Sequence, residues 1–202
     1  MVVVEKKPET QVRTIPAYLA YEEMNGEALP YKGYLDVLAG NKKPEEIMGS
    51  SSIQAIVLSF IHGFLYWNIN RKRYYLAINE SGLHIDTNNN LANDIAIFEK
   101  DKIIPNNKYF NVPPKIVIEV DTKVDLSETS WDSDSDYVLE KAQKMLDFGV
   151  EKLIWISTRN KKIFVSSSSQ NWYYTNFDED ILIMDDCVLN LARLLEEEKF
   201  EF

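Results

Sequence analysis

The sequence has little cysteine, glycine and histidine, and these shortages exclude several kinds of site. Its 202 residues include one cysteine, Cys187, so no disulfide can form within the chain and we expect a reducing, cytoplasmic location. With seven glycines there is no glycine-rich phosphate loop, which excludes nucleotide hydrolysis by that route. The two histidines, His62 and His84, have no metal-ligand spacing with each other or with the cysteine.

Positive charge is also scarce. The chain has 22 lysines and arginines against 32 acidic residues, a net charge of -10. A protein of this charge is not attracted as a whole to a nucleic-acid backbone, so such binding must depend on local basic spots such as Arg71–Arg73 and Lys161–Lys162. Residues 47–70 carry no formal charge, but polar residues such as Gln54 interrupt them. We therefore expect a buried helix there and no membrane partner.

The apolar content is sufficient for one compact domain. Hydrophobic residues make up 45% of the chain and aromatic residues 12%. No internal repeat or long linker divides it, so we predict a flexible N-terminus over 1–14 and a single domain over 15–202. Residues 15–29 are expected to form a short helix or an extended segment, broken by a turn at Asn25–Gly26.

The rest of the chain alternates between short β-type runs and helical segments. In the segment 137–148, apolar residues recur at spacings of three and four, and Gly149 follows as a helix stop. We expect helices over 45–70, 137–148 and 188–198, and strands over 73–79, 83–86, 94–98, 115–121, 152–157, 161–167 and 172–177. This order predicts an α/β (α+β) fold with a mixed β-sheet flanked by helices.

One of the predicted strands carries a charge where a core strand should be apolar. Glu119 lies in the run 115–121, and an uncompensated charge inside a sheet costs several kcal/mol. Asp121 is two residues further on, where strand alternation gives the same face, and Asp94 begins another strand. Convergent carboxylates favour a hard cation, so Asp94, Glu119 and Asp121 are candidate metal ligands. Alternatively, Asp94 caps a turn and the other two face solvent at a sheet end.

Lys141 is the candidate cationic partner of these carboxylates. On the helix 137–148 it falls about 90° from the centre of the apolar face, so it can reach a site beside the packed layer. The alternative is a lysine whose stem packs on apolar surface while its ammonium reaches water. Lys123 is a second candidate lysine if the strand 115–121 continues that far.

Several of these residues occur in a pattern that resembles the Uma2 family, a group of restriction-endonuclease-like proteins. The pattern comprises Asn93–Asp94, the IVIEV run of 116–120, Lys141 ahead of a Gly-Val pair, and the strand EKLIWI of 151–156. The segment YEEMNGEAL of 21–29 is similar to the N-terminal segment of that family. The resemblance covers most of the chain.

The resemblance implies a PD-(D/E)XK nuclease-like fold with a site for a divalent metal, Mg²⁺ or Mn²⁺. It also implies that the protein cuts DNA at this site. By position, Asp94 and Glu119 would be the metal carboxylates and Lys141 the active-site lysine, so these three are the predicted catalytic residues. Glu22 is a weaker candidate that could complete the site.

The pattern also departs from the family, which leaves two hypotheses. Asn93 replaces the usual proline, Asp121 stands where the wider superfamily has lysine, and Thr122 replaces a common serine. The first hypothesis is a Mg²⁺-dependent endonuclease acting on DNA. The second is a catalytically inactive nuclease-fold protein that binds protein or nucleic acid, which the net negative charge and the acidic segment 124–136 favour. A homodimer is a further expectation, because the helix 50–67 is apolar almost all round.

Overall fold

The structure, a computed structural model, describes residues 15–131 and 133–202. The strands are β1 (Ala20–Met24), β2 (Glu27–Pro30), β3 (Tyr74–Asp86), β4 (Asn89–Glu99), β5 (Ile116–Val120), β6 (Lys152–Ser157), β7 (Lys162–Ser167), β8 (Tyr173–Asn176), β9 (Ile181–Met184) and β10 (Cys187–Leu189). The helices are α1 (Tyr34–Leu38), α2 (Ser52–Asn68), α3 (Asp134–Phe148) and α4 (Leu191–Glu197), with short 3-10 turns at Ala17–Leu19, Pro44–Glu46 and Lys100–Lys102. The flexible N-terminus predicted for 1–14 lies outside the described residues.

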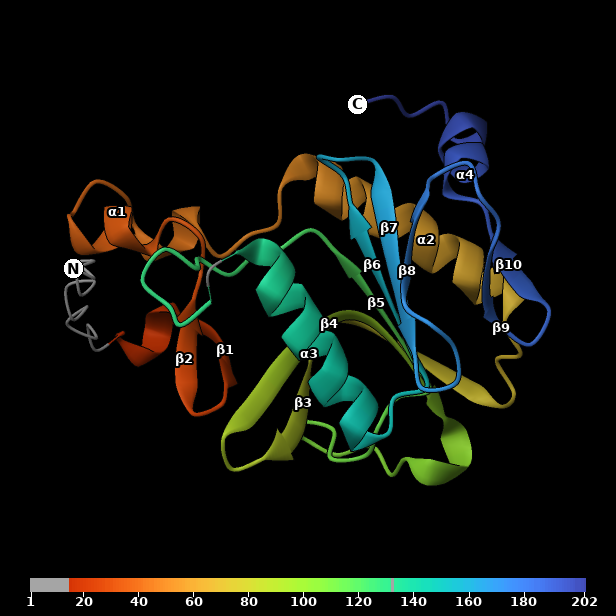
Figure 1. The fold of residues 1–202 in the computed structure, drawn as a ribbon, viewed down its shortest axis with the longest axis horizontal. Helices are drawn as coiled ribbons and strands as arrows, with labels where there is room; N and C mark the ends of the chain where they lie inside the picture. Colours follow the sequence, from red (N-terminus) through yellow and green to blue (C-terminus); the bar gives the residue numbers. More distant parts are fainter. Residues whose placement is uncertain (1–14, 132) are drawn as a thin grey trace, which may run out of the picture.

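A mixed sheet of eight strands lies at the centre of the molecule (Figure 1). Its order is β2-β1-β4-β5-β6-β7-β8, and β3 also pairs with β4. The pair β5–β6 is parallel, and α3 forms the crossover between its two strands. The other pairs are antiparallel. This confirms the predicted mixed sheet flanked by helices.

The two long helices cover opposite faces of the sheet, with α3 in front and α2 behind in Figure 1. One core lies under α2 and includes Val57, Ile61 and Leu65 together with Ile118 and Ile154 of the sheet. The other lies under α3 and includes Val138, Ala142 and Met145 together with Val117 and Leu153. Alternate residues of β5 and β6 thus point to opposite faces, as strand geometry requires. None of the helices in the described ranges is long and apolar enough to cross a membrane.

Both long helices have ends that the sequence specifies. The Oγ of Ser51 accepts a hydrogen bond from the backbone N–H of Gln54 at 3.2 Å, which caps the start of α2. At the end of α3, Gly149 takes the left-handed conformation with φ 116°, as predicted from its position. An added Cβ there would also lie 3.1 Å from Pro113, in the proline pair that precedes β5. This turn therefore fixes α3 against the strand that carries Glu119.

Four predicted element boundaries are wrong. The predicted helix over 45–70 begins only at Ser52 and ends at Asn68. The expected break between 73–79 and 83–86 is an irregularity within the single strand β3, because backbone pairing with β4 resumes at Ser81. For the same reason β4 begins at Asn89, which places Asp94 inside the strand rather than at its start. The predicted helix 188–198 begins only at Leu191, and the residues before it pair as β10.

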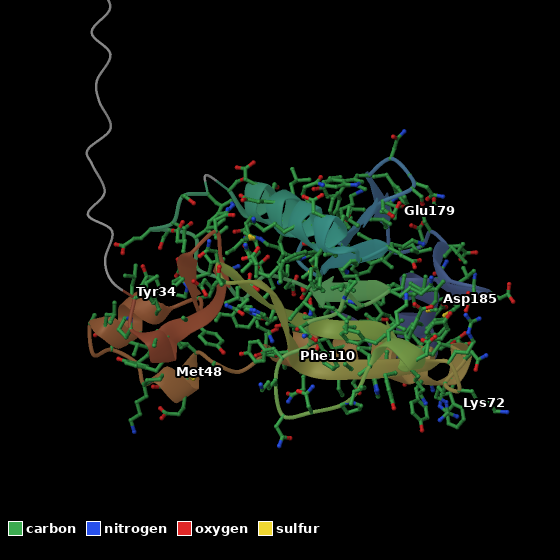
Figure 2. The ribbon with its side chains drawn as sticks, turned by 90° about the horizontal axis from the view of Figure 1, so that it is seen from below. Tyr34, Met48, Lys72, Phe110, Glu179 and Asp185 are labelled. Atoms are coloured by element: carbon green, nitrogen blue, oxygen red, sulfur yellow. The ribbon has the colours of Figure 1, made fainter. Side chains whose placement is uncertain are left out.

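The N-terminal part of the described chain forms a hairpin at one end of the molecule. Strands β1 and β2 pair about the turn predicted at Asn25–Gly26, whose φ angles are 57° and 74°. Strand β1 then joins the main sheet through β4. In Figure 2, Tyr34 and Met48 lie at the end beyond this hairpin, whereas Lys72 and Asp185 lie at the opposite end.

Candidate active site

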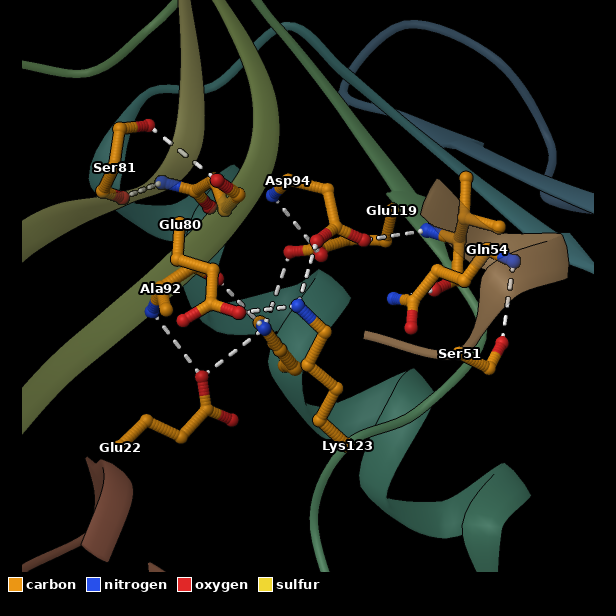
Figure 3. Close-up of polar contacts among 12 residues, drawn as sticks. Glu22, Ser51, Gln54, Glu80, Ser81, Ala92, Asp94, Glu119 and Lys123 are labelled. Carbon is orange, nitrogen blue, oxygen red and sulfur yellow. Dashed lines mark hydrogen bonds and ion pairs between the residues drawn. The ribbon is translucent and has the colours of Figure 1, made fainter. Parts of the chain in front are cut away.

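Asp94 and Glu119 face each other across two neighbouring strands. Because β4 and β5 are antiparallel with Ile95 opposite Ile118, the same register sets Asp94 opposite Glu119. The backbone N–H of Asp94 donates to Glu119 Oε2 at 3.4 Å, and the N–H of Val120 donates to Asp94 Oδ2 at 2.9 Å (Figure 3). Both carboxylates are buried. The strands therefore bring together two of the predicted metal ligands.

Lys141 extends from α3 into the same buried cluster. Its Nζ lies 3.1 Å from Glu119 Oε1 and 3.1 Å from Glu22 Oε2, and it donates to the carbonyl of Ala92 at 3.0 Å. The side chain is 1% exposed. It is therefore a buried ion-pair partner rather than a lysine that reaches water. The structure places Lys141 and Glu22 with Glu119, the grouping that the resemblance implied.

Glu22 is itself held by the elements around it. Its Oε2 accepts a hydrogen bond from the N–H of Ala92 at 3.2 Å, and its Oε1 accepts one from the Tyr137 hydroxyl. The ring of Trp155 lies below the ammonium of Lys141, with 5.4 Å between Nζ and the ring centroid. Sequence reasoning gave Tyr137 no role, because a tyrosine at the start of α3 fits the apolar face of that helix equally well.

Lys123 forms a second ion-paired bridge in the site. Its Nζ lies 3.5 Å from Asp94 Oδ1 and contacts the carboxylate of Glu80 directly (Figure 3). Glu80 was not predicted as a site residue. It follows Asn79 at the irregularity in β3, and both residues have left-handed backbones with φ angles of 54° and 68°. The Asn-Glu-Ser-Gly run that interrupts the strand pattern was the available signal.

The charges of this network do not balance. Four carboxylates, on Glu22, Glu80, Asp94 and Glu119, meet only the two ammonium groups of Lys123 and Lys141. If all six are ionised, the network has an excess of two negative charges. Unbalanced charge in a buried site is costly unless a proton or a cation neutralises it.

The pKa values of the pair reflect this imbalance. Burial raises the pKa of Glu119 to about 8 against the opposing attraction of Lys141, and the nearby carboxylates of Asp94 and Glu22 raise it further. Burial also raises the pKa of Asp94, although the hydrogen bond from Val120 and the charge of Lys123 oppose this. For Lys141, burial alone would lower the pKa, but Glu119 and Glu22 outweigh it and raise the pKa. Lys141 thus stays charged. The carboxyls of Asp94 and Glu119 carry negative charge together only if a further cation neutralises it.

Asp121, the third predicted metal ligand, has different partners. Strand β5 ends at Val120, and Asp121 has a left-handed backbone with φ 58°. Its carboxylate accepts hydrogen bonds from the N–H of Thr158 at 2.8 Å and from the Thr158 hydroxyl at 2.6 Å. It is thus tied to the loop after β6 rather than to the network around Asp94. The carbonyl of Val120 accepts a hydrogen bond from Gln54 Nε2 at 2.6 Å, which links the start of α2 to the site.

The carboxylates of Asp94 and Glu119 suit a magnesium ion whose coordination is completed by water and phosphate. Glu119 Oε1 is buried, and its partner among the described residues is the ammonium of Lys141 at 3.1 Å. Across 15–131 and 133–202, no group of three or more histidine, cysteine or acidic side chains is arranged to hold a metal ion. Mg²⁺ is commonly bound by one or two carboxylates, with waters and substrate phosphates as the other ligands. Asp94 and Glu119 fit that pattern.

The fold is shared with a solved protein. A crystal structure described as "a putative nuclease belonging to DUF820 from Anabaena variabilis ATCC 29413" matches this chain with a TM-score of 0.64 and 13% sequence identity. The match covers 87% of this chain and 89% of that one. No protein-family model and no curated protein matches the sequence. The chain therefore has the mixed-sheet fold of that DUF820 protein.

Proposed function

We propose that this protein is a metal-dependent nuclease that hydrolyses DNA phosphodiester bonds at the Asp94–Glu119 pair, with Mg²⁺ or Mn²⁺ as its cofactor. The observation that carries the proposal is the excess of carboxylates over ammonium groups in the network around this pair, held beside Lys141. A purely structural core would gain nothing from such an excess, whereas a site for a divalent cation requires it. The fold shared with a protein described as a nuclease supports the same conclusion.

In this proposal the side chains have distinct roles. Asp94 and Glu119 hold the metal, which when bound supplies a water of lowered pKa and offsets charge on the phosphate. Lys141 stabilises the negative charge that develops on the phosphate oxygens, because its ammonium is already fixed by three acceptors. Glu22 is a positioning residue for Lys141. Lys123 is the alternative lysine, and it can stay paired with Glu80 when Asp94 is engaged by a ligand.

A second candidate function is a nuclease-fold protein that binds partners without catalysis. The observation that favours it is burial: Glu22, Asp94, Glu119 and Lys141 are all at most 5% exposed. A substrate phosphate must reach the pair, so an active enzyme has to move a covering group such as the Lys123–Glu80 bridge. A binding module has no such requirement.

Nicking of supercoiled plasmid by the purified protein distinguishes the two functions. We expect cleavage with Mg²⁺ or Mn²⁺, no cleavage with EDTA, and loss of cleavage in Glu119→Gln, which keeps the side-chain shape but removes the charge. The matched control is Glu151→Gln, because Glu151 is an exposed residue that forms an ion pair with Lys115 and has no contact with Asp94 or Glu119 among the described ion pairs. Its activity should equal that of the wild type.

The outcomes of this experiment separate cleanly. Metal-dependent nicking that disappears in Glu119→Gln and persists in Glu151→Gln supports the proposal. Folded wild-type protein that does not nick the plasmid with any divalent metal supports the binding module. Nicking that survives in Glu119→Gln indicates a contaminating nuclease or a different site, and it contradicts the assignment made here.

A further inference from the structure

A row of side chains leads from the candidate active site to the edge of the sheet. Glu119 lies opposite Trp155 in the parallel pair β5–β6, Trp155 lies opposite Phe164 on β7, and Phe164 lies opposite Tyr174 on β8. Residues directly opposite each other share a face of the sheet. With neighbouring strands about 4.8 Å apart, the row extends about 14 Å from Glu119 to Tyr174. It therefore connects the buried carboxylate with the surface.

A cavity of about 540 Å³ lies over the outer part of this row. Trp155 and Phe164 line it and are buried, whereas Tyr174 is 61% exposed. The rings of Phe164 and Tyr174 are 5.0 Å apart and tilted by 39°. Tyr174 is thus an exposed aromatic ring supported from one side, which is suited to stacking against a flat ligand.

The rim of the cavity gathers three cations from separate segments. Lys32 comes from the loop after β2, Arg159 from the turn after β6, and Lys162 from the start of β7. Two carboxylates also line the cavity. Asp134 lies 3.9 Å from the ammonium of Lys32, and Asp121 is hydrogen-bonded to Thr158, so the three cations exceed the carboxylates by one charge. The guanidinium of Arg159 forms no ion pair with the part of the chain that the structure describes. In a protein with a net charge of -10, this is a local site for an anion.

We propose that this cavity binds a single strand of DNA that continues from the Asp94–Glu119 pair. Arg159 and Lys162 contact its phosphates, with Lys32 at the far rim, and a base stacks on Tyr174. Cations that follow a backbone, combined with an aromatic platform, are the features of single-strand binding. A duplex keeps its base faces inside its own stack, so it cannot use Tyr174 in this way. The proposal rests on the proposed function for its relation to cleavage, but binding can be measured without cleavage.

The test is fluorescence anisotropy of a labelled single-stranded DNA, measured in EDTA so that no cleavage occurs. We expect Tyr174→Ala to weaken binding about five-fold or more, because stacking on an aromatic ring contributes about 1 to 3 kcal/mol per base. Tyr174→Phe keeps the ring and should retain most of the affinity. Arg159→Ala/Lys162→Ala should weaken binding and reduce the slope of log affinity against log salt by about 1.4, since each single-strand phosphate contact contributes about 0.7.

The matched control for the double variant is Lys72→Ala/Arg73→Ala, which removes the same charge from the segment between α2 and β3, outside the residues that line the cavity. The inference is overturned if wild-type protein does not bind the single strand, if the two double variants lose affinity equally, or if unlabelled duplex competes better than unlabelled single strand. These results are separate from those for cleavage. If the protein binds the single strand through Tyr174 but never cuts DNA, the result supports single-strand binding in the cavity and contradicts the nuclease proposal. If the protein cuts DNA but Tyr174→Ala does not affect binding, the result supports the nuclease proposal and contradicts single-strand binding in the cavity.

Discussion

The two faces of the central sheet are built differently. Under α2, the buried residues of the helix are Val57, Ile61, Leu65 and one polar side chain, Gln54, and they belong to a core that includes apolar sheet residues such as Ile118 and Ile154. Under α3, a core of similar construction also encloses the charged network around Lys141. One sheet thus has a face that only stabilises the fold and a face that keeps charges at a cost. That difference is the main reason for assigning the chemistry to the α3 face.

The largest expected effect comes from breaking the network at its most buried cation. Lys141→Met leaves Glu22 and Glu119 without their shared partner and should lower the free energy of unfolding by about 3 to 5 kcal/mol. Urea unfolding monitored by circular dichroism measures this. Lys144→Met on the more exposed side of the same helix is the control and should change the value by about 0.5 kcal/mol or less. Equal losses in the two variants would show that the network has no special energetic role.

A substitution on the α2 face should be costly in a different way. Leu65→Ala removes fully buried apolar volume and should cost about 2 to 5 kcal/mol. Because Leu65 packs in an apolar core, this loss should be the same at pH 5 and pH 8. The loss caused by Lys141→Met should instead grow with pH, most steeply above the Glu119 pKa of about 8, where the ionised carboxylate needs the lysine. A pH-dependent loss in Leu65→Ala would remove the contrast between the faces.

The stability of metal-free wild-type protein should itself depend on pH. Folding raises the pKa of Glu119 from 4.5 to about 8, so the folded state binds more protons than the unfolded state between these values. Stability therefore falls as pH rises from about 4.5 to 8, by up to about 5 kcal/mol, since each pKa unit corresponds to about 1.4 kcal/mol. Thermal unfolding in EDTA across this interval measures it. In Glu119→Gln the dependence should be much weaker, and an unchanged slope would contradict the assignment.

The smallest effect on stability is expected at the partly exposed bridge. Lys123→Met breaks the contacts with Asp94 and Glu80 and should cost about 1 kcal/mol. The variant increases the excess of negative charge on the pair, so Mg²⁺ should raise its melting temperature more than that of the wild type. A smaller rise than in the wild type would indicate that Lys123 supports the metal site instead of competing with the ion for Asp94.

Much of the fold follows from local patterns in the sequence. The period of the segment 137–148, the stop at Gly149 and the turn at Asn25–Gly26 all predicted the observed elements. The long pairing of β3 with β4 could not be predicted in this way, because its polar residues lack an alternating pattern. Backbone hydrogen bonds hold that part of the hairpin together, and they leave little trace in side-chain type.

The site was predictable where burial conflicts with charge. Glu119 stands out because it interrupts an apolar strand, and the position of Lys141 on the helix flank gave its direction. Glu80 and Tyr137 could not be found in the same way, since their contacts depend on a strand irregularity and on packing between distant segments. The contacts of Asp121 also depend on tertiary structure, because its left-handed backbone after β5 directs its carboxylate to Thr158.

Titration of Mn²⁺ into the protein, followed by calorimetry, tests most directly whether the α3 face is built around a divalent cation. We predict one ion bound per chain by the wild type, loss of binding in Asp94→Asn and in Glu119→Gln, and retention in Asp121→Asn and in the surface control Glu151→Gln. Absence of binding to the folded wild type, or binding that is unchanged in both Asp94→Asn and Glu119→Gln, would contradict the account.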